Sequence, residues 1–132
     1  VDRVTTDLRE GLAGADMGAA WLLPRIIGFG LASELLMTGE FIEAERAHRI
    51  GLYNRVVPAE RLQAEAQAFA AALARGPSFA LGITKDALNR EASMDLRSAF
   101  EAEAQAQAGC MLNPNFREAY EAFRAKRPPR FV

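Results

Sequence analysis

The second half of the chain carries apolar residues at helical spacing, interrupted by proline and glycine. Between Pro58 and Gly76 the apolar positions recur in steps of four, three and four residues, at Leu62, Ala66, Phe69 and Leu73. Such spacing places them on one face of a helix, and a glycine at the end is typical of a helix terminus. The pattern therefore predicts an amphipathic helix between Pro58 and Gly76.

Three further helices are predicted downstream. The first begins at Pro77, whose fixed φ suits a first helical turn, and runs to about Arg90. The longest takes Ser93 as its N-cap and extends to Asn113, and the last ends before Pro128, which cannot continue a helix. The stripe that the longest helix is expected to bury consists of Leu96, Phe100, Ala104 and Met111.

The first half of the chain mixes shorter elements. An apolar helix is predicted over 28–38, because Gly39 follows where a helix commonly ends. A short extended piece at 41–42 and a two-turn helix at 43–50 come next. Residues 52–57 are β-branched and aromatic enough to predict a short strand. Together the elements predict a mainly α fold with one or two short strands.

Composition narrows the class of protein. The 132 residues are 50% hydrophobic and 25% charged, which is typical of one globular domain. The net charge is −1, so the sequence gives no electrostatic reason to expect nucleic-acid or membrane partners. The lone Cys110 cannot form an internal disulfide, and no metal site is predicted because no cysteine or histidine cluster has ligand spacing. We expect a cytoplasmic location, since the polar N-terminus lacks a signal-peptide core and a membrane-spanning run.

The narrow apolar stripes raise a problem of burial. Ordering each residue costs roughly 1.5 kcal/mol. Without a substantial sheet, several such stripes leave little margin for an independent core. Either the helices pack on one another, or another chain covers them.

Five segments together give the chain a family resemblance. They are LPRIIG (Leu23 to Gly28), ELLMTG (Glu34 to Gly39), the Ala44/Ala47 pair, GLYNRVVP (Gly51 to Pro58) and AFRAKRPPRF (Ala122 to Phe131). In this order they resemble the crotonase family, which comprises enoyl-CoA hydratases and isomerases. The resemblance covers nearly all of residues 11–131.

For the fold, the resemblance implies the C-terminal helical part of a crotonase, with the N-terminal ββα spiral absent. Residues 1–58 would then be the last part of the core with its Gly-rich loop, and residues 59–132 a C-terminal helical oligomerisation region. A trimeric or hexameric homo-oligomer is expected, because the family's C-terminal helices build such contacts. The chain begins with Val, which fits a truncated, processed or alternatively started product.

For the activity, the resemblance implies an enoyl-CoA hydratase of fatty acid metabolism, which adds water across the α,β double bond of a fatty acyl-CoA thioester. Coenzyme A is then part of the substrate, and no cofactor is expected. Crotonases polarise the thioester with two backbone N–H groups from N-terminal loops, which this chain lacks, so the chain alone is expected to be inactive. A dienoyl-CoA or enoyl-CoA isomerase is one alternative. A non-catalytic helical oligomerisation module is another.

Two acids are candidate catalytic residues. The run GLAGADMG resembles the loop in which dienoyl-CoA isomerases carry an aspartate that moves protons along the acyl chain, and this assigns the role to Asp16. An apolar, Gly-lined loop would desolvate its carboxylate, as acid–base catalysis near neutral pH requires. Asp7 lies four residues before Gly11, where crotonases carry a second carboxylate, although usually a glutamate. The alternatives are a turn aspartate for Asp16 and an exposed acid near a chain end for Asp7.

Three further residues are assigned to substrate binding. Met17 and Trp21 would line the acyl pocket, because an apolar ring beside the catalytic loop excludes water. Plain core packing is the alternative for both. Lys126 falls at the lysine of the crotonase tail, which the family places near the adenosine phosphate of coenzyme A. It could instead solvate the end of the last helix.

Overall fold

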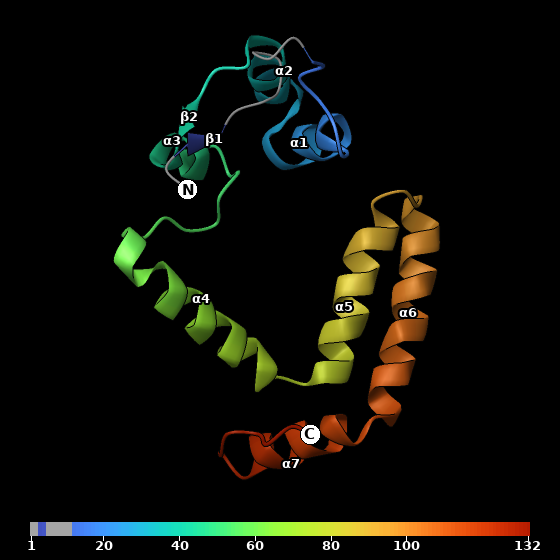
Figure 1. Cartoon of the computed structure of the whole chain (residues 1–132). Helices are drawn as coiled ribbons and strands as arrows, with labels where there is room; N and C mark the ends of the chain where they lie inside the picture. Colours follow the sequence, from blue (N-terminus) through green and yellow to red (C-terminus); the bar gives the residue numbers. More distant parts are fainter. Residues whose placement is uncertain (1–2, 5–11) are drawn as a thin grey trace. The chain divides into compact units, whose positions relative to one another are not determined.

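The computed structural model describes residues 3–4 and 12–132, and Figure 1 shows the order of the elements along the chain. The elements of the described residues are β1 (Arg3–Val4), α1 (Ala19–Ile27), α2 (Phe29–Thr38), β2 (Ile42–Glu43), α3 (Ala44–Arg49), α4 (Ala59–Ala74), α5 (Ser78–Glu91), α6 (Leu96–Leu112) and α7 (Pro114–Arg124). The predicted mainly α fold with short strands is confirmed. By its contacts the chain divides into two compact units, Val1–Glu60 and Arg61–Val132.

Helix α1, like the short strand β1, was not predicted from the sequence. It contains Pro24, which lacks an N–H and is usually a sign that a helix ends. Gly28 follows the helix with φ of 82°, a backbone conformation open to glycine without a steric penalty. Because of this residue, α2 starts directly after α1, and the two helices pack against each other.

The core of the first unit joins the end of α1 to α2, β2 and α3. Its buried members are Ile27, Ala32, Leu35, Ile42 and Ala47. Ile42 is 2% exposed and has the largest fully buried side chain among the described residues. In the antiparallel pairing of β1 with β2, Ile42 lies opposite Val4. Full burial of a side chain of this size contributes about 1.5–3 kcal/mol, so Ile42 anchors the unit.

Residues 52–57 do not form the predicted strand. The backbone N–H groups of Leu52 and Tyr53 both donate to the carbonyl oxygen of Ala47, at 2.8 and 3.2 Å. The carbonyl oxygen of Tyr53 lies 2.9 Å from Nδ1 of His48. The end of α3 therefore supplies the hydrogen bonds that a neighbouring strand would have made. The two-stranded sheet of the described residues consists of β1 and β2.

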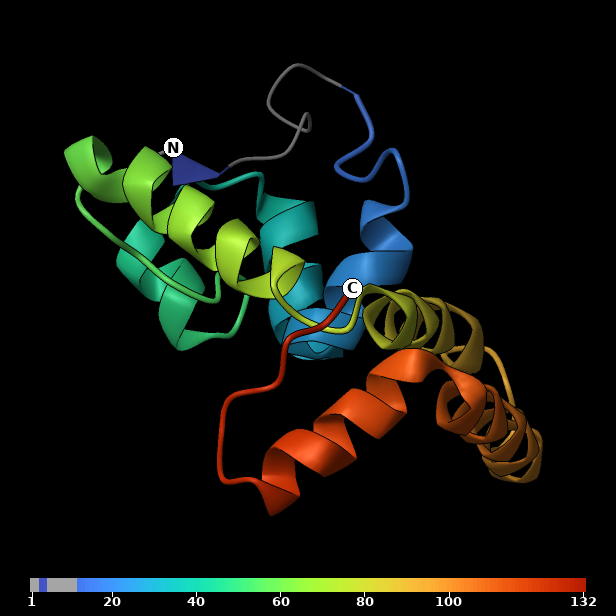
Figure 2. The same ribbon diagram turned by 90° about the horizontal axis from the view of Figure 1, so that it is seen from below.

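In the second unit, α5 and α6 run side by side in opposite directions, and α7 contacts α6 (Figures 1 and 2). The apolar stripes of the long helices are exposed. Leu62 of α4 is 54% exposed, and Phe100 of α6 is 60% exposed. The predicted burial of the α6 stripe is therefore wrong for the part of the chain that the structure describes. None of the helices in that part is long and apolar enough to cross a membrane.

The N-cap of α6 is Asp95, not Ser93 as predicted. One carboxylate oxygen of Asp95 accepts a hydrogen bond from the backbone N–H of Ser98 at 3.0 Å, and the other accepts from the Ser98 hydroxyl at 2.7 Å. Ser93 instead donates its hydroxyl to the carbonyl oxygen of Arg90, at the end of α5. Both residue types cap helices, so spacing alone could not choose between them.

The C-terminal tail, meaning the residues after α7, is fastened to α7 at two places. The Glu118 carboxylate accepts hydrogen bonds from the guanidinium of Arg127 at 2.6 and 3.0 Å, and from the backbone N–H of Arg130 at 2.7 Å. Buried Asn115 donates through Nδ2 to the carbonyl oxygen of Val132 at 2.9 Å, and accepts from the Val132 N–H at 3.1 Å. Side chains of α7 thus hold the tail along the helix.

The contact with the tail lowers the pKa of Glu118. The hydrogen bond from the Arg127 side chain, followed by the one from the Arg130 N–H, lowers the pKa of Glu118 to about 2. Donors directed at a carboxylate stabilise its charged form and so hold the proton off. The contact therefore favours the folded tail only while Glu118 is ionised.

Truncation of Ile42 to alanine is expected to lower the free energy of unfolding of the first unit by about 2–5 kcal/mol, because a cavity remains in the core. Trp21 is the one tryptophan of the chain and lies in α1, so its fluorescence in a urea titration reports this unit. Met37 is 76% exposed, and Met37→Ala should change the unfolding free energy by less than about 0.5 kcal/mol. Equal effects of the two substitutions would contradict the assignment of the core.

The fastening of the tail is expected to weaken in acid. The pKa of Glu118 is lowered in the folded chain from the ordinary 4.5 to about 2, so the folded state binds fewer protons than the unfolded state between these values. The stability from this contact is complete above pH 4.5 and is lost as the pH falls towards 2. The hydrogen-exchange protection factor of the Arg130 amide should fall over this range, and should be low throughout in Glu118→Gln. A protection factor that stays constant down to pH 2 would disprove the expectation.

Candidate functional site

A tight turn places Asp16 directly before α1. The carbonyl oxygen of Asp16 accepts a hydrogen bond from the N–H of Ala19 at 2.8 Å. The carbonyl oxygen of Gly18 accepts from the N–H groups of Trp21 and Leu22, at 3.0 and 2.9 Å. These bonds form the first turn of the helix, so the start of α1 fixes the backbone of Asp16. A helix N-terminus, with its unpaired N–H groups, favours a negative charge nearby.

Met17, next to Asp16, has a strained backbone. Its φ is 44°, in the left-handed region, and such a conformation costs a residue with a Cβ about 1–2 kcal/mol. The side chain is 96% exposed, so packing within the described residues does not offset this cost. Strain of this kind collects at functional sites, where the surrounding structure holds it in place.

Trp21 lies in the first turn of α1 and is held by Arg25. The guanidinium carbon of Arg25 lies 3.7 Å from the centre of the Trp21 ring, and Nη1 donates to the Trp21 carbonyl oxygen at 2.8 Å. A cation over an indole face is attracted by the ring's electrons. Arg25 therefore orients the ring, a role that sequence analysis missed although the four-residue spacing on a helix could have suggested it.

The structure brings Asp16, Met17 and Trp21 together at the start of α1, but it does not enclose them. Asp16 is exposed, and Trp21 is about half exposed. The expectation that an apolar loop desolvates the Asp16 carboxylate is therefore not met by the described residues. Ile26, further along α1, is exposed as well. Any enclosure would have to come from other residues.

Asp7, the second candidate acid, lies outside the described residues. Lys126 belongs to the second unit, where it follows α7 in a left-handed conformation with φ of 51°. The N–H of Lys126 donates to the carbonyl oxygen of Phe123 at 3.1 Å, and the N–H of Arg127 donates to that of Ala122 at 3.0 Å. This is the pattern of a helix end at which glycine is the usual left-handed residue. The lysine side chain itself is exposed.

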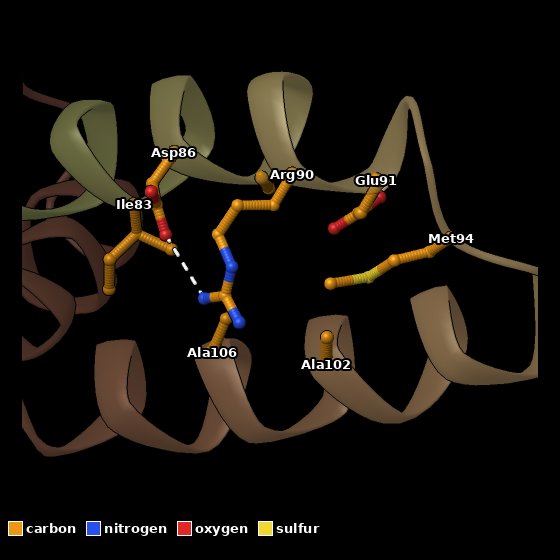
Figure 3. A pocket seen from close by; sticks show the side chains of 8 residues that line it. Ile83, Asp86, Arg90, Glu91, Met94, Ala102 and Ala106 are labelled. Atoms are coloured by element: carbon orange, nitrogen blue, oxygen red, sulfur yellow. Dashed lines mark hydrogen bonds and ion pairs between the residues drawn. The ribbon is translucent and has the colours of Figure 1, made fainter.

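The second unit has a shallow groove between α5 and α6. Figure 3 shows Arg90 reaching across it, paired with Asp86 at 3.2 Å, with Met94 at one end. The opposite wall carries the small side chains of Ala102 and Ala106. The groove is lined by this ion pair and by the carboxylate of Glu91, and its lining includes no Ser, Cys, Lys or His. Within the described ranges, 3–4 and 12–132, no group of His, Cys, Asp and Glu could hold a metal ion.

The position and order of these features can be compared with known proteins. A sequence model of the family described as enoyl-CoA hydratase/isomerase matches residues 6–132. The 1,2-epoxyphenylacetyl-CoA isomerase of Escherichia coli (strain K12) is 38% identical over 117 residues, which are 89% of this chain and 45% of the relative. The crotonyl-CoA hydratase of Syntrophomonas wolfei is 35% identical, over 87% of this chain and 44% of the relative.

A solved structure gives the same result. The enoyl-CoA hydratase of Bacillus anthracis aligns with a TM-score of 0.91 and 31% identity, over 98% of this chain and 50% of that one. The chain spans about half the length of the relatives that it matches. Because the family match covers nearly all of its residues, the chain belongs to the enoyl-CoA hydratase/isomerase family.

Proposed function

We propose that this chain supplies the C-terminal half of an enoyl-CoA hydratase, which adds water across the α,β double bond of a fatty acyl-CoA thioester. The observation that carries the proposal is the family match over residues 6–132, which includes the Gly-rich loop before α1. The similarity to a crotonyl-CoA hydratase supports hydration of an enoyl thioester. The reaction would belong to fatty acid metabolism in the cytoplasm, and coenzyme A would enter as part of the substrate, with no separate cofactor.

In this proposal Asp16 exchanges a proton with the acyl chain, with Asp7 as the second acid. The turn before α1 fixes the Asp16 backbone. Met17 and Trp21 would contact the acyl chain, and their exposure in the described residues leaves them available to it. Two backbone N–H donors must also bind the thioester oxygen as negative charge develops on it. These would come from outside the chain, so the chain by itself is expected to be inactive.

Isomerisation is the second candidate function, and Asp16 is the observation that favours it. A carboxylate at this loop position can remove a proton from one carbon of the acyl chain and return it to another. The relative that is 38% identical is a 1,2-epoxyphenylacetyl-CoA isomerase, so the matched relatives include an isomerase of a CoA thioester. Hydration and isomerisation share the bound enolate-like thioester and differ in whether water is added.

Lys126 is proposed to bind a phosphate of coenzyme A. A lysine in a left-handed turn, where glycine would be less strained, indicates that its side chain has a use. Its compact ammonium suits a phosphate as a point charge.

A homo-oligomer, trimeric or hexameric, is also proposed, because the apolar stripes of α4 and α6 are exposed. Exposed apolar surfaces of this kind mark contacts between proteins. In this role the second unit would act as an oligomerisation region. If the chain lacked any catalytic role, as the non-catalytic alternative holds, this would be its whole function.

Turnover of crotonyl-CoA tests the proposal most directly. The 132-residue chain is expected to be inactive, and a protein lengthened upstream from the same coding region is expected to remove the enoyl absorbance. Activity of the short chain would disprove that it is incomplete, and inactivity of both would contradict hydration. A dienoyl-CoA substrate that is isomerised without gaining water would favour the second candidate.

In the active protein, Asp16→Asn should lower kcat by about 100-fold to 10,000-fold, the usual contribution of a positioned acid or base. Asp86→Asn is the matched control, because it removes the same charge from an exposed residue of α5. It should leave kcat within about twofold, in line with the small worth of an exposed ion pair. An unchanged kcat in Asp16→Asn would remove Asp16 from the mechanism.

The left-handed turn at Lys126 can be tested by stability alone. Lys126→Gly should be more stable to unfolding than Lys126→Ala by about 1 kcal/mol, because both lose the charge and only glycine is unstrained at positive φ. At the neighbouring Ala125, whose φ is −81°, substitution by glycine should destabilise by about 0.5–1 kcal/mol. Opposite signs at the two adjacent positions, measured by urea denaturation, would verify the geometry, and equal signs would contradict it.

A further inference from the structure

Glu118 and Asn115 hold the tail that turns at Lys126. We propose that both are positioning residues for Lys126, because they fix the turn from which its ammonium group reaches a phosphate of coenzyme A. This inference rests on the phosphate contact proposed for Lys126. It adds the residues that orient the contact.

The first attachment begins at the residue after Lys126. The Arg127 N–H bonds the end of α7, and its guanidinium donates to both carboxylate oxygens of Glu118, at 2.6 and 3.0 Å. An arginine that donates twice to a carboxylate fixes orientation as well as distance. Glu118 also accepts from the N–H of Arg130, so two points of the tail meet on one side chain. The backbone that follows Lys126 is therefore held both by a main-chain carbonyl of α7 and by the Glu118 side chain.

The second attachment is the buried Asn115, which is 6% exposed. Its side-chain amide pairs with both the N–H and the carbonyl of Val132, much as a neighbouring strand would. Its own backbone N–H donates to Oδ1 of Asn113, which caps α7. Loss of the Val132 contact would leave buried polar groups of Asn115 unpaired, so this attachment opposes fraying of the tail.

The two adjacent cations of the turn are used differently. Arg127 is engaged by Glu118, whereas the Lys126 side chain has no hydrogen-bond or ion-pair partner among the described residues. The planar fork of arginine matches a carboxylate, and the ammonium of lysine is a compact charge. Because Arg127 neutralises the nearby carboxylate, the charge of Lys126 stays available to an anion.

The test is an NMR titration of the 132-residue chain with coenzyme A and with dephospho-coenzyme A, which lacks the phosphate on the ribose of the adenosine. The measured quantity is the ratio of the two affinities, together with the protection factors of the Arg130 and Val132 amides. Glu118→Gln is the test variant, and Asn115→Ala is the second. Glu121→Gln is the matched control, because its carboxylate also acts electrostatically on Arg127 but pairs with Arg117, at 3.5 Å, and makes no hydrogen bond to the tail among the described residues.

We expect the unaltered chain to prefer coenzyme A over its dephospho form. Glu118→Gln should free the tail amides and reduce this preference by about twofold to fivefold, the size of an exposed charge contact. Asn115→Ala should act in the same direction, and Glu121→Gln should change neither quantity. Equal weakening of both ligands by Glu118→Gln would overturn the proposal, because it would reveal a purely structural role.

A further variant, Lys126→Met, separates this inference from the proposed function. Suppose that Lys126→Met lowers the preference for coenzyme A over dephospho-coenzyme A. If Glu118→Gln then frees the tail but leaves this preference unchanged, the positioning role is disproved and the phosphate contact stands. If Lys126→Met leaves the preference unchanged, the phosphate contact fails, and the positioning role fails with it. A freed tail together with parallel losses in Lys126→Met and Glu118→Gln would support both.

Discussion

The small number of buried side chains is the constraint on which the rest of this structure depends. Ile42 is the largest fully buried side chain among the described residues, and the second unit buries little more than Asn115 and Ala122. The helices there are specified by local features, namely caps, internal hydrogen bonds and ion pairs one turn apart. Such features give helices their ends and lengths but contribute little to holding them together.

This scarcity explains why polar contacts position both candidate sites. The loop before α1 is held by backbone hydrogen bonds at its turn, and Trp21 is held by Arg25 through a contact at the surface. At the other end of the chain, a carboxylate and an amide of α7 fasten the tail where no apolar core is present to do so. Hydrogen bonds depend on direction, so they can fix a turn where packing is thin. Sites held this way keep their residues exposed to a partner or substrate.

Much of the fold could be predicted from sequence, because helix periodicity and terminating residues are local properties. The stops at Gly39 and Gly51 and the helix between Pro58 and Gly76 are in place. Helix α1 was not predicted, and it contains a proline, a residue that usually interrupts a helix. Residues 52–57 have the composition of a strand, but a strand needs a neighbouring strand to pair with. Leu52 and Tyr53 instead donate their N–H groups to a carbonyl oxygen of α3.

The candidate sites were less predictable. The Gly-rich run singled out Asp16, but it predicted neither the helix that follows this residue nor the exposure of its side chain. The partners of the tail lie 9 to 17 residues apart along the chain, between a helix and an irregular segment, and no periodicity links them. Only the folded chain reveals such contacts.

The exposed stripe of α6 also has a thermodynamic consequence. If copies of the chain cover this stripe for one another, association and folding become a single equilibrium, and stability depends on protein concentration. Dilution would then act on the second unit as a denaturant does, while the first unit, with Ile42 in its own core, would respond less. The melting temperature of the second unit would thus depend on protein concentration, whereas that of the first unit would depend mainly on the packing of its own core.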